Sequence, residues 1–317
     1  MPTARRRCKR MALAVLACAG LTALAAHALD ARYSDKDGDL VADAPEHTTD
    51  PATLVFAYSP GEDLALYERI WGDFLRHLER ATGKRVLFYA VQSNTAQVEA
   101  MRAGRLHIAA FGTGTVPIAV NCAGFVPFAI MGGDKGILGY QMEIITYPGS
   151  GIQTPADLKG RKLAFTSVTS NSGYKMAAMM LERQFNLKAG KDYVAVFSGK
   201  HEHSVLGVAN RDYEAAAIAN EVMRRMMARG VVSKDQIVSV YKSQTFPTAG
   251  FGLIYNLNPV LAKKVREAFF SFPWAGSQLE KEFSNLGVSK FVPITYAKDW
   301  AVVRDVDAAM NVSYNCK

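Results

Sequence analysis

Short apolar runs alternate with helical segments through most of the chain, and this alternation constrains the fold more than any other feature. The runs 54–58, 86–90 and 108–111 have the length and composition of buried strands. Between them, 64–82 carries apolar residues at helical spacing and 94–102 is a second predicted helix. Strands that alternate with helices in this way predict an α/β fold built on parallel sheets.

The same alternation continues after residue 140. Further strands are predicted at 141–146, 162–165, 193–197, 215–218, 237–241 and 251–255, and further helices at 175–182, 204–210, 260–270, 276–286 and 297–310. A chain of this length exceeds one comfortable hydrophobic core. We therefore expect two lobes, 54–140 with 249–317 and 141–248, and two crossings between them predict a hinge over a cleft.

The turn between the predicted strand 162–165 and the following helix is rich in small polar side chains. Ser170, Asn171 and Ser172 fall at the start of the helix. The first N–H groups of a helix have no partner within it, and the helix dipole makes this end partly positive. Hydroxyls and free N–H groups together suit a small oxyanion. Ordinary helix capping remains the alternative.

Three turns of the first half also carry hydroxyl or amide groups, and none carries Lys or Arg. They place Tyr58 at the end of a strand, Thr113 shortly after a strand and Asn94 at a helix start. Sites in α/β sheets lie beyond the carboxyl ends of the strands. We expect these residues to line the same cleft as the Ser170 turn, although simple turn chemistry explains each one separately.

Residues 1–28 have the features of an export signal. A basic segment precedes the apolar run 11–25, and 26–28 fits a cleavage site after Ala28. The run is short for a membrane span. We expect an exported, periplasmic protein; an uncleaved anchor or a lipoprotein attached at Cys18 is the alternative.

Charge and cysteine content set further bounds. Of 37 basic residues, five lie in 1–28, which leaves 32 against 29 acidic residues and no clustered basic surface for nucleic acid. Cys122 and Cys316 remain after the signal, and a lone pair in an oxidising compartment predicts a disulfide. Two separate buried thiols are the alternative.

The acidic stretch 29–53 contains Asp35, Asp37 and Asp39, which resemble the first half of a calcium loop. However, Leu40 occupies the place where an EF-hand needs Gly for its sharp turn. We therefore expect a solvated acidic tail, and neither a metal nor a cofactor is predicted.

His201 raises two alternatives, a metal site with His203 and a hydrolase with Ser172. A metal site at His201 and His203 lacks further ligands. A serine hydrolase that pairs Ser172 with His201 lacks the nucleophile elbow and an acid partner. We expect no catalytic residues and assign His201 as a donor to an anion. Glu221 is either a site residue or an exposed acid at a helix start, because a carboxylate repels an anion unless a proton or cation separates them.

With these turns in place, the chain resembles the phosphonate/phosphite-binding component of bacterial ABC importers, a group of type II periplasmic binding proteins, over roughly residues 54–272. The resemblance rests on 111–113, 139–140, 170–173, 201–202 with 208–210 behind it, and 220–221.

The resemblance implies roles for individual residues. The run Ser170–Asn171–Ser172 and His201 would hold phosphonate oxygens, and Tyr140 would be a cleft tyrosine. A second cleft tyrosine of the family falls at Asn94.

Glu221 matches the acid that holds the amino group of an aminophosphonate, but the partner Asp aligns near Ala249. This loss favours phosphite, methylphosphonate or phosphate over aminoalkyl phosphonates.

The sequence thus predicts a monomeric solute-binding protein that closes over a phosphonate-like oxyanion (phosphonate, phosphite or phosphate) and delivers it to an ABC permease. A binder or sensor of another small oxyanion or organic acid remains the alternative. The expected ligand-binding residues are Tyr58, Asn94, Thr113, Tyr140, Ser170, Asn171, Ser172, His201 and Glu221.

Overall fold

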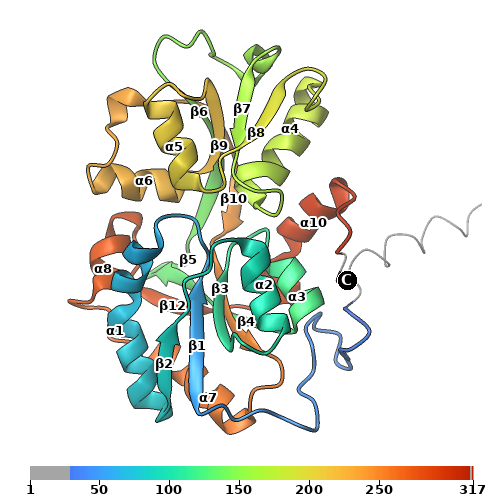
Figure 1. Ribbon diagram of the computed structural model, residues 1–317, viewed down its shortest axis with the longest axis vertical. Helices are drawn as coiled ribbons and strands as arrows, with labels where there is room; N and C mark the ends of the chain where they lie inside the picture. Colours follow the sequence, from blue (N-terminus) through green and yellow to red (C-terminus); the bar gives the residue numbers. More distant parts are fainter. Residues whose placement is uncertain (1–28, 315, 317) are drawn as a thin grey trace, which may run out of the picture.

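The computed structural model describes residues 29–314 and 316, and two β-sheets flanked by helices form two lobes (Figure 1). The predicted signal peptide, with Cys18, lies outside the described residues. Within this part of the chain, one sheet has seven strands and the other has five. The expected two-lobed α/β architecture is confirmed.

The first lobe is the seven-stranded sheet with its helices. Its strand order is β12-β4-β11-β3-β1-β2, with β5 paired to β4. The strands are β1 (Thr53–Tyr58), β2 (Arg85–Phe88), β3 (Ile108–Phe111), β4 (Phe125–Gly133), β5 (Gly136–Ile137), β11 (Gly250–Ile254) and β12 (Lys290–Pro293). The helices are α1 (Leu64–Thr82), α2 (Asn94–Arg102), α3 (Val116–Ala123), α7 (Pro259–Phe270), α8 (Gln278–Phe283) and α9 (Tyr296–Asp299).

Helix α1 illustrates how the sequence builds this lobe. The Asp63 side chain accepts the backbone N–H of Leu66 at the start, and Gly83 ends the helix in a left-handed conformation. Trp71 and Phe74 on its buried face contact Phe56 of β1. The apolar periodicity of 64–82 therefore corresponds to the face that covers the sheet.

The second lobe is the five-stranded sheet with order β10-β6-β9-β7-β8. Its strands are β6 (Gly139–Thr146), β7 (Lys162–Phe165), β8 (Val194–Phe197), β9 (Ala215–Ala219) and β10 (Val238–Pro247), and its helices are α4 (Met176–Phe185), α5 (His201–Ala209) and α6 (Asn220–Ala228). β9 is buried along its whole length, as expected for a central strand covered on both faces.

Only part of each sheet is parallel, which corrects the expectation of parallel sheets. β1, β2 and β3 are parallel, and so are β7, β8 and β9. The strands that extend these cores, β4 and β11 in the first lobe and β6 and β10 in the second, pair antiparallel. β6 and β10 both adjoin the chain crossings, so these antiparallel strands connect the lobes.

The C-terminal helix α10 (Ala301–Ala309) contacts two elements of the second lobe, α4 and a short π-helical turn, Asn171–Lys175. The Lys175 Nζ lies 2.5 Å from the Asp307 carboxylate, and both side chains are buried. Lys175 also donates to the Gly114 carbonyl of the first lobe at 2.9 Å. The segment after β12 therefore bridges both lobes, although it was expected within the first; the predicted lobe bounds stay a prediction.

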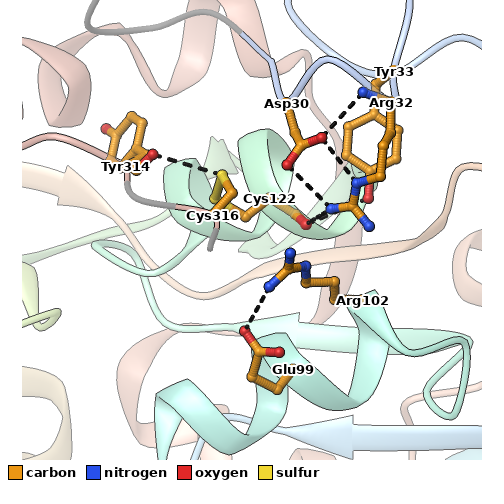
Figure 2. The surroundings of a disulfide bond; sticks show 8 residues. All are labelled: Asp30, Arg32, Tyr33, Glu99, Arg102, Cys122, Tyr314 and Cys316. Carbon is orange, nitrogen blue, oxygen red and sulfur yellow. Dashed lines mark hydrogen bonds and ion pairs between the residues drawn. A yellow bond between two sulfur atoms is a disulfide. The ribbon is translucent and has the colours of Figure 1, made fainter.

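The predicted disulfide is confirmed: Cys122 at the end of α3 is bonded to Cys316 (Figure 2). The bond fixes the last described residue to the first lobe. None of the helices within residues 29–314 is both long and apolar enough to cross a bilayer.

The stretch 29–53 lies against the first lobe, which corrects the expectation of a solvated tail. Val41 and Ala42 are buried, and the Thr49 carbonyl accepts the Asn258 N–H at 2.7 Å. Leu40 adopts the left-handed conformation with φ of 69°. The turn that was thought to require Gly is therefore formed by Leu40, at some cost in backbone strain.

Candidate functional site

A cleft lies between the lobes, at the carboxyl ends of the parallel strands. Both lobes contribute to its lining, and all nine expected ligand-binding residues are part of it. The alternation of strands and turns brings these residues together because parallel strands end at the same edge of a sheet. The residues that line it are Tyr58, Ser59, Pro60, Gly61, Tyr67, Asn94, Gly112, Thr113, Gly114, Thr115, Tyr140, Thr166, Ser167, Ser170, Asn171, Ser172, Gly199, Lys200, His201, Ala219, Glu221, Val222, Arg225 and Ala249.

The polar turn after β7 forms one wall of the cleft. Ser170 caps the π-turn: its hydroxyl oxygen accepts the Gly173 N–H at 2.9 Å. The capping interpretation is therefore correct for this oxygen, while the hydroxyl proton stays available for a ligand. Asn171 and Ser172 follow in the turn and are buried, as required of groups that contact a bound ion rather than solvent.

The Tyr140 hydroxyl lies among polar side chains from both lobes. The Asn171 amide donates to the Tyr140 hydroxyl at 3.2 Å. Burial raises the pKa of Tyr140, and hydrogen bonds with Thr113, Asn171 and Ser172 partly oppose this shift. Tyr140 is thus a neutral phenol at neutral pH and lies among the groups expected to hold the ligand.

His201 is the first residue of α5, three residues earlier than the predicted helix start at 204 and not at a strand end. Its Nδ1 accepts the Ala219 N–H at 3.1 Å. Burial, together with the charge of Arg225, lowers the pKa of His201 to about 4. The neutral ring therefore carries its proton on Nε2, which leaves one donor for an anion.

Asn94 connects the two lobes at the edge of the cleft. Its amide donates to Thr169 Oγ1 at 3.0 Å and to Ser167 Oγ at 3.3 Å, both in the second lobe. Ser93, and not Asn94, caps α2. Where the family resemblance places a tyrosine, this chain thus has an amide that contacts the opposite lobe directly.

The hydroxyl of Thr113 donates to the Pro247 carbonyl at 2.8 Å. Its proton therefore holds the segment in which the chain returns from the second lobe to the first. The neighbouring Thr115 is 1% exposed, and its hydroxyl has no hydrogen-bond partner within the described residues. Thr115 precedes α3 without capping it. Sequence reasoning did not select Thr115, although a hydroxyl at a helix start was the signal that could have found it.

Gly114 allows the lobes to approach each other. A Cβ at this position would lie 2.5 Å from both the Thr169 carbonyl oxygen and the Asn171 nitrogen. Any side chain would therefore push the polar turn away from the first lobe. The contact across the cleft requires glycine here because backbone meets backbone.

Charged residues of α6 form the floor of the cleft. Glu221 lines it, and burial raises the pKa of its carboxyl group. Arg225 lies one helical turn later and is 2% exposed. Sequence reasoning missed Arg225 because it considered cations only in the turns. The i, i+4 spacing from Glu221 was the available signal. Tyr58 lines the same cleft, and burial raises the pKa of its hydroxyl.

A second cavity adjoins the cleft and shares Tyr58, Glu221 and Ala249 with it. Most of its other side chains are apolar and come from the first lobe, among them Leu138, Phe251, Phe283, Leu286 and Val288. Asn220 and Arg224 of α6 add polar groups from the second lobe. The small Ala249 lies at the boundary of the two spaces. The arrangement offers polar donors on one side and an apolar space on the other.

Away from the cleft, Asp35, Asp37 and Asp39 have carboxylate oxygens within 4.8 Å of one another. These carboxylates are exposed or half-buried. Oxygen ligands of this kind suit Ca²⁺. Asp35 already accepts the N–H groups of Gly38 and Leu40.

A family model described as ABC transporter, phosphonate, periplasmic substrate-binding protein matches residues 56–300. The Phosphate-import protein PhnD of Mycolicibacterium smegmatis is 27% identical over 279 residues, which are 84% of this chain and 86% of that protein.

Two solved structures share the fold. A binding protein component of an ABC phosphonate transporter from Pseudomonas aeruginosa has a TM-score of 0.73 at 23% identity, covering 81% of this chain and 86% of that one. PhnD1 of Prochlorococcus marinus in complex with methylphosphonate has a TM-score of 0.72 at 15% identity, covering 83% and 99%.

Fold and cleft define a type II periplasmic binding protein, a class in which two lobes enclose a ligand. The family model covers well over half of the chain. The chain therefore belongs to the family of periplasmic substrate-binding proteins of phosphonate ABC transporters, as the sequence resemblance implied. Its relatives are solute-binding components of importers rather than enzymes.

Proposed function

We propose that this protein captures a phosphonate-like oxyanion between its lobes and delivers it to an ABC permease. The observation that carries the proposal is the convergence of uncharged donors on one cleft. Asn171 and Ser172 come from the second lobe, and Thr115 comes from the first. His201 adds an Nε2 proton. Neutral donors hold an oxyanion without a salt bridge.

The number of donors fits a useful affinity. Hydrogen bonds to charged groups contribute about 1.5–3 kcal/mol each. Five of them, the four named above and the Ser170 hydroxyl, give a gross stabilisation on the order of 10 kcal/mol. A micromolar complex corresponds to a binding free energy of about 8 kcal/mol. The gross stabilisation exceeds this value, and the difference can offset part of the cost of ordering the ligand and the lobes.

The second cavity and Glu221 bear on which anion is bound. A ligand with a carbon substituent can place it in the apolar space beyond Ala249. A ligand with a P–OH group can donate to Glu221, so that a proton lies between the carboxylate and the anion. The description of the family names phosphonate, which has a carbon substituent. The relative is named as a phosphate-import protein, and phosphate can carry a P–OH group.

The cellular part of the proposal follows from the family and from residues 1–28. The export signal would carry the protein to the periplasm, where it acts as a monomer. Release by cleavage after Ala28, rather than anchoring at Cys18, remains a prediction. N-terminal sequencing of the protein secreted by its host tests it.

Titration calorimetry tests the ligand class. The mature protein is titrated with phosphate, phosphite, methylphosphonate and 2-aminoethylphosphonate, with sulfate and acetate as controls. We expect micromolar or tighter binding of at least one phosphorus anion. Ser172→Ala is expected to weaken that binding about tenfold, the loss of one charge-assisted hydrogen bond. Heat from acetate or sulfate alone would instead assign a different anion class.

A further inference from the structure

A network of four charged side chains joins the lobes on the side of the cleft opposite α10. Glu62 lies between β1 and α1, and Glu282 lies on α8, both in the first lobe. Arg225 lies on α6 in the second lobe, and Arg229 directly follows the last residue of that helix. Figure 1 shows α6 directly above α8 and the start of α1. We call these four residues the interlobe clasp.

Each arginine of the clasp contacts both glutamates. Arg225 Nη1 lies 2.9 Å from Glu282 Oε1, and the other guanidinium group nitrogen Nη2 contacts Glu62. Arg229 contacts Glu62 and Glu282 directly. Every one of these four ion pairs crosses between the lobes. Alternating charges of this kind form a closed network in which no member has a single partner.

The clasp is largely removed from solvent. The side chains of Glu62 and Arg225 are 0% and 2% exposed, and those of Glu282 and Arg229 are 10% and 22% exposed. The Tyr67 hydroxyl donates to Glu62 at 3.2 Å. The Arg225 guanidinium lies 4.9 Å from the centre of the Phe283 ring, another contact across the lobes. A buried ion pair is costly to break by removal of one partner, because the other charge stays buried.

The clasp touches the ligand site through Arg225. Arg225 lines the cleft, and its Nε has no hydrogen-bond partner within the described residues. Its charge acts on His201 and Glu221, which lie in the same cleft. Separation of the lobes would withdraw Glu62 and Glu282 from α6.

We propose that Glu62, Arg225, Arg229 and Glu282 form a clasp that holds the lobes closed over the bound anion and thereby sets its residence time. The identity of the bound anion rests on the proposed function. The effect of the clasp on lobe closure does not. Its contribution appears only after the lobes meet, so it acts on dissociation more than on association. The residues are positioning residues, since three of the four do not line the cleft.

The test is a double-mutant cycle on the two clasp residues outside the cleft lining, Arg229→Gln and Glu282→Gln. Each single variant is expected to weaken methylphosphonate, phosphite or phosphate binding about tenfold, through faster dissociation at an unchanged association rate. The double variant is expected to lie within about twofold of the weaker single variant, because both changes break the same network. Glu214→Gln, which removes an ion pair with Arg161 inside the second lobe, is the matched control and should leave affinity unchanged.

Small-angle X-ray scattering of the same variants without ligand gives an independent reading. We expect a larger radius of gyration for Arg229→Gln and Glu282→Gln than for the parent protein and Glu214→Gln, at matched thermal stability. Unchanged dissociation and unchanged scattering in both variants would overturn the clasp. If the parent binds none of the anions, the proposed function fails, while the scattering comparison still decides whether the clasp closes the lobes.

Discussion

A single backbone hydrogen bond determines how His201 can act. Since Nδ1 accepts from Ala219, the ring can donate only through Nε2, and the lowered pKa keeps it neutral at the pH of most cells. The sequence placed His201 in the site by resemblance. Its tautomer depends on Ala219, 18 residues away along the chain, and no local pattern predicts that contact.

Replacement of His201 by Gln tests this state through the pH dependence of stability. The folded pKa of about 4 lies below the ordinary 6.5. Between these values the unfolded chain binds a proton that the folded protein does not, so stability falls as pH falls from 6.5 towards 4 and is independent of this group above 6.5. From pH 7.5 to 4.5 the parent should lose about 2–3 kcal/mol more free energy of unfolding than His201→Gln, by urea titration.

His77 and His107 also have lowered pKa values, but they are the same in both proteins and cancel in the comparison. Equal losses in the two proteins would show that His201 is protonated normally.

Thr115→Val should separate ligand binding from stability. The hydroxyl is buried and without a partner, so its removal should leave the melting temperature within about 1–2 °C of the parent or raise it slightly. Anion affinity should fall roughly five- to tenfold, as expected for one lost hydrogen bond.

Thr146→Val is the matched control. Thr146 is equally buried, but its hydroxyl donates to the Glu214 carbonyl at 2.6 Å, far from the cleft lining. This variant should lose stability and keep its affinity. The opposite pattern in the two variants would remove Thr115 from the site.

At the scale of elements, alternation predicted most strands and helices, and its failures have physical causes. β4 was missed: Pro127 lies within it, and proline normally argues against a strand with neighbours on both sides. The sheet accommodates it at a register shift, where Pro127 pairs with Gly252 of β11. β12 was missed because its four residues are bounded by polar positions and show too short a pattern.

The link between α3 and the C-terminal segment rests on the disulfide. The double variant Cys122→Ser/Cys316→Ser should lose about 2–5 kcal/mol of unfolding free energy in urea titration, since the bond closes a loop of 194 residues and restricts the unfolded chain. Dithiothreitol should lower the stability of the parent by a similar amount and leave the variant unchanged. An equally stable variant would mean that the helix contacts alone hold this segment.

At the scale of the whole molecule, the sequence could predict the parts of the site but not how the lobes meet. Turns after parallel strands are local features, and these placed the Ser170 turn and Thr113 on one cleft. The clasp joins Glu62 to Arg229, 167 positions apart, and each looks like an ordinary surface charge in the sequence. The close approach of Gly114 to the polar turn of the opposite lobe likewise cannot be predicted from the residues around Gly114 in the sequence. Closure is therefore a property of three-dimensional contacts.

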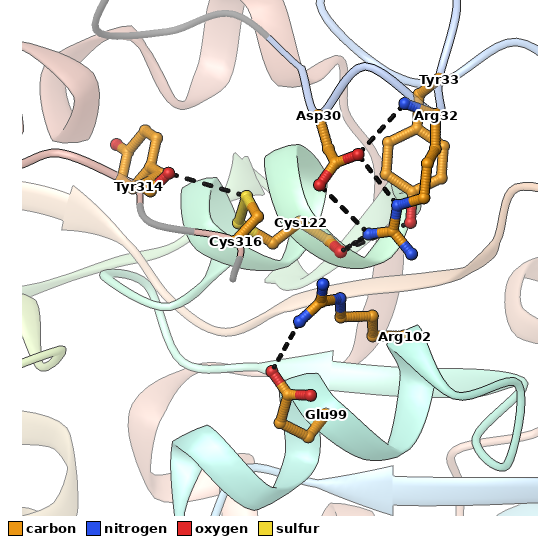
Figure 3. A network of polar contacts seen from close by, with 8 residues as sticks. All are labelled: Asp30, Arg32, Tyr33, Glu99, Arg102, Cys122, Tyr314 and Cys316. Atoms are coloured by element: carbon orange, nitrogen blue, oxygen red, sulfur yellow. Dashed lines mark hydrogen bonds and ion pairs between the residues drawn. A yellow bond between two sulfur atoms is a disulfide. The ribbon is translucent and has the colours of Figure 1, made fainter.

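Both ends of the described chain converge on α3. The Asp30 N–H donates to the Asn121 carbonyl at 2.9 Å, and the Arg32 guanidinium donates to the Cys122 carbonyl at 3.0 Å, beside the disulfide to Cys316 (Figure 3). A lipid tether, a biosensor surface or a fused fluorophore attached at either end would therefore be linked to the first lobe. The opposite lobe would stay free to swing, so immobilised protein should respond to its ligand much as the free protein does.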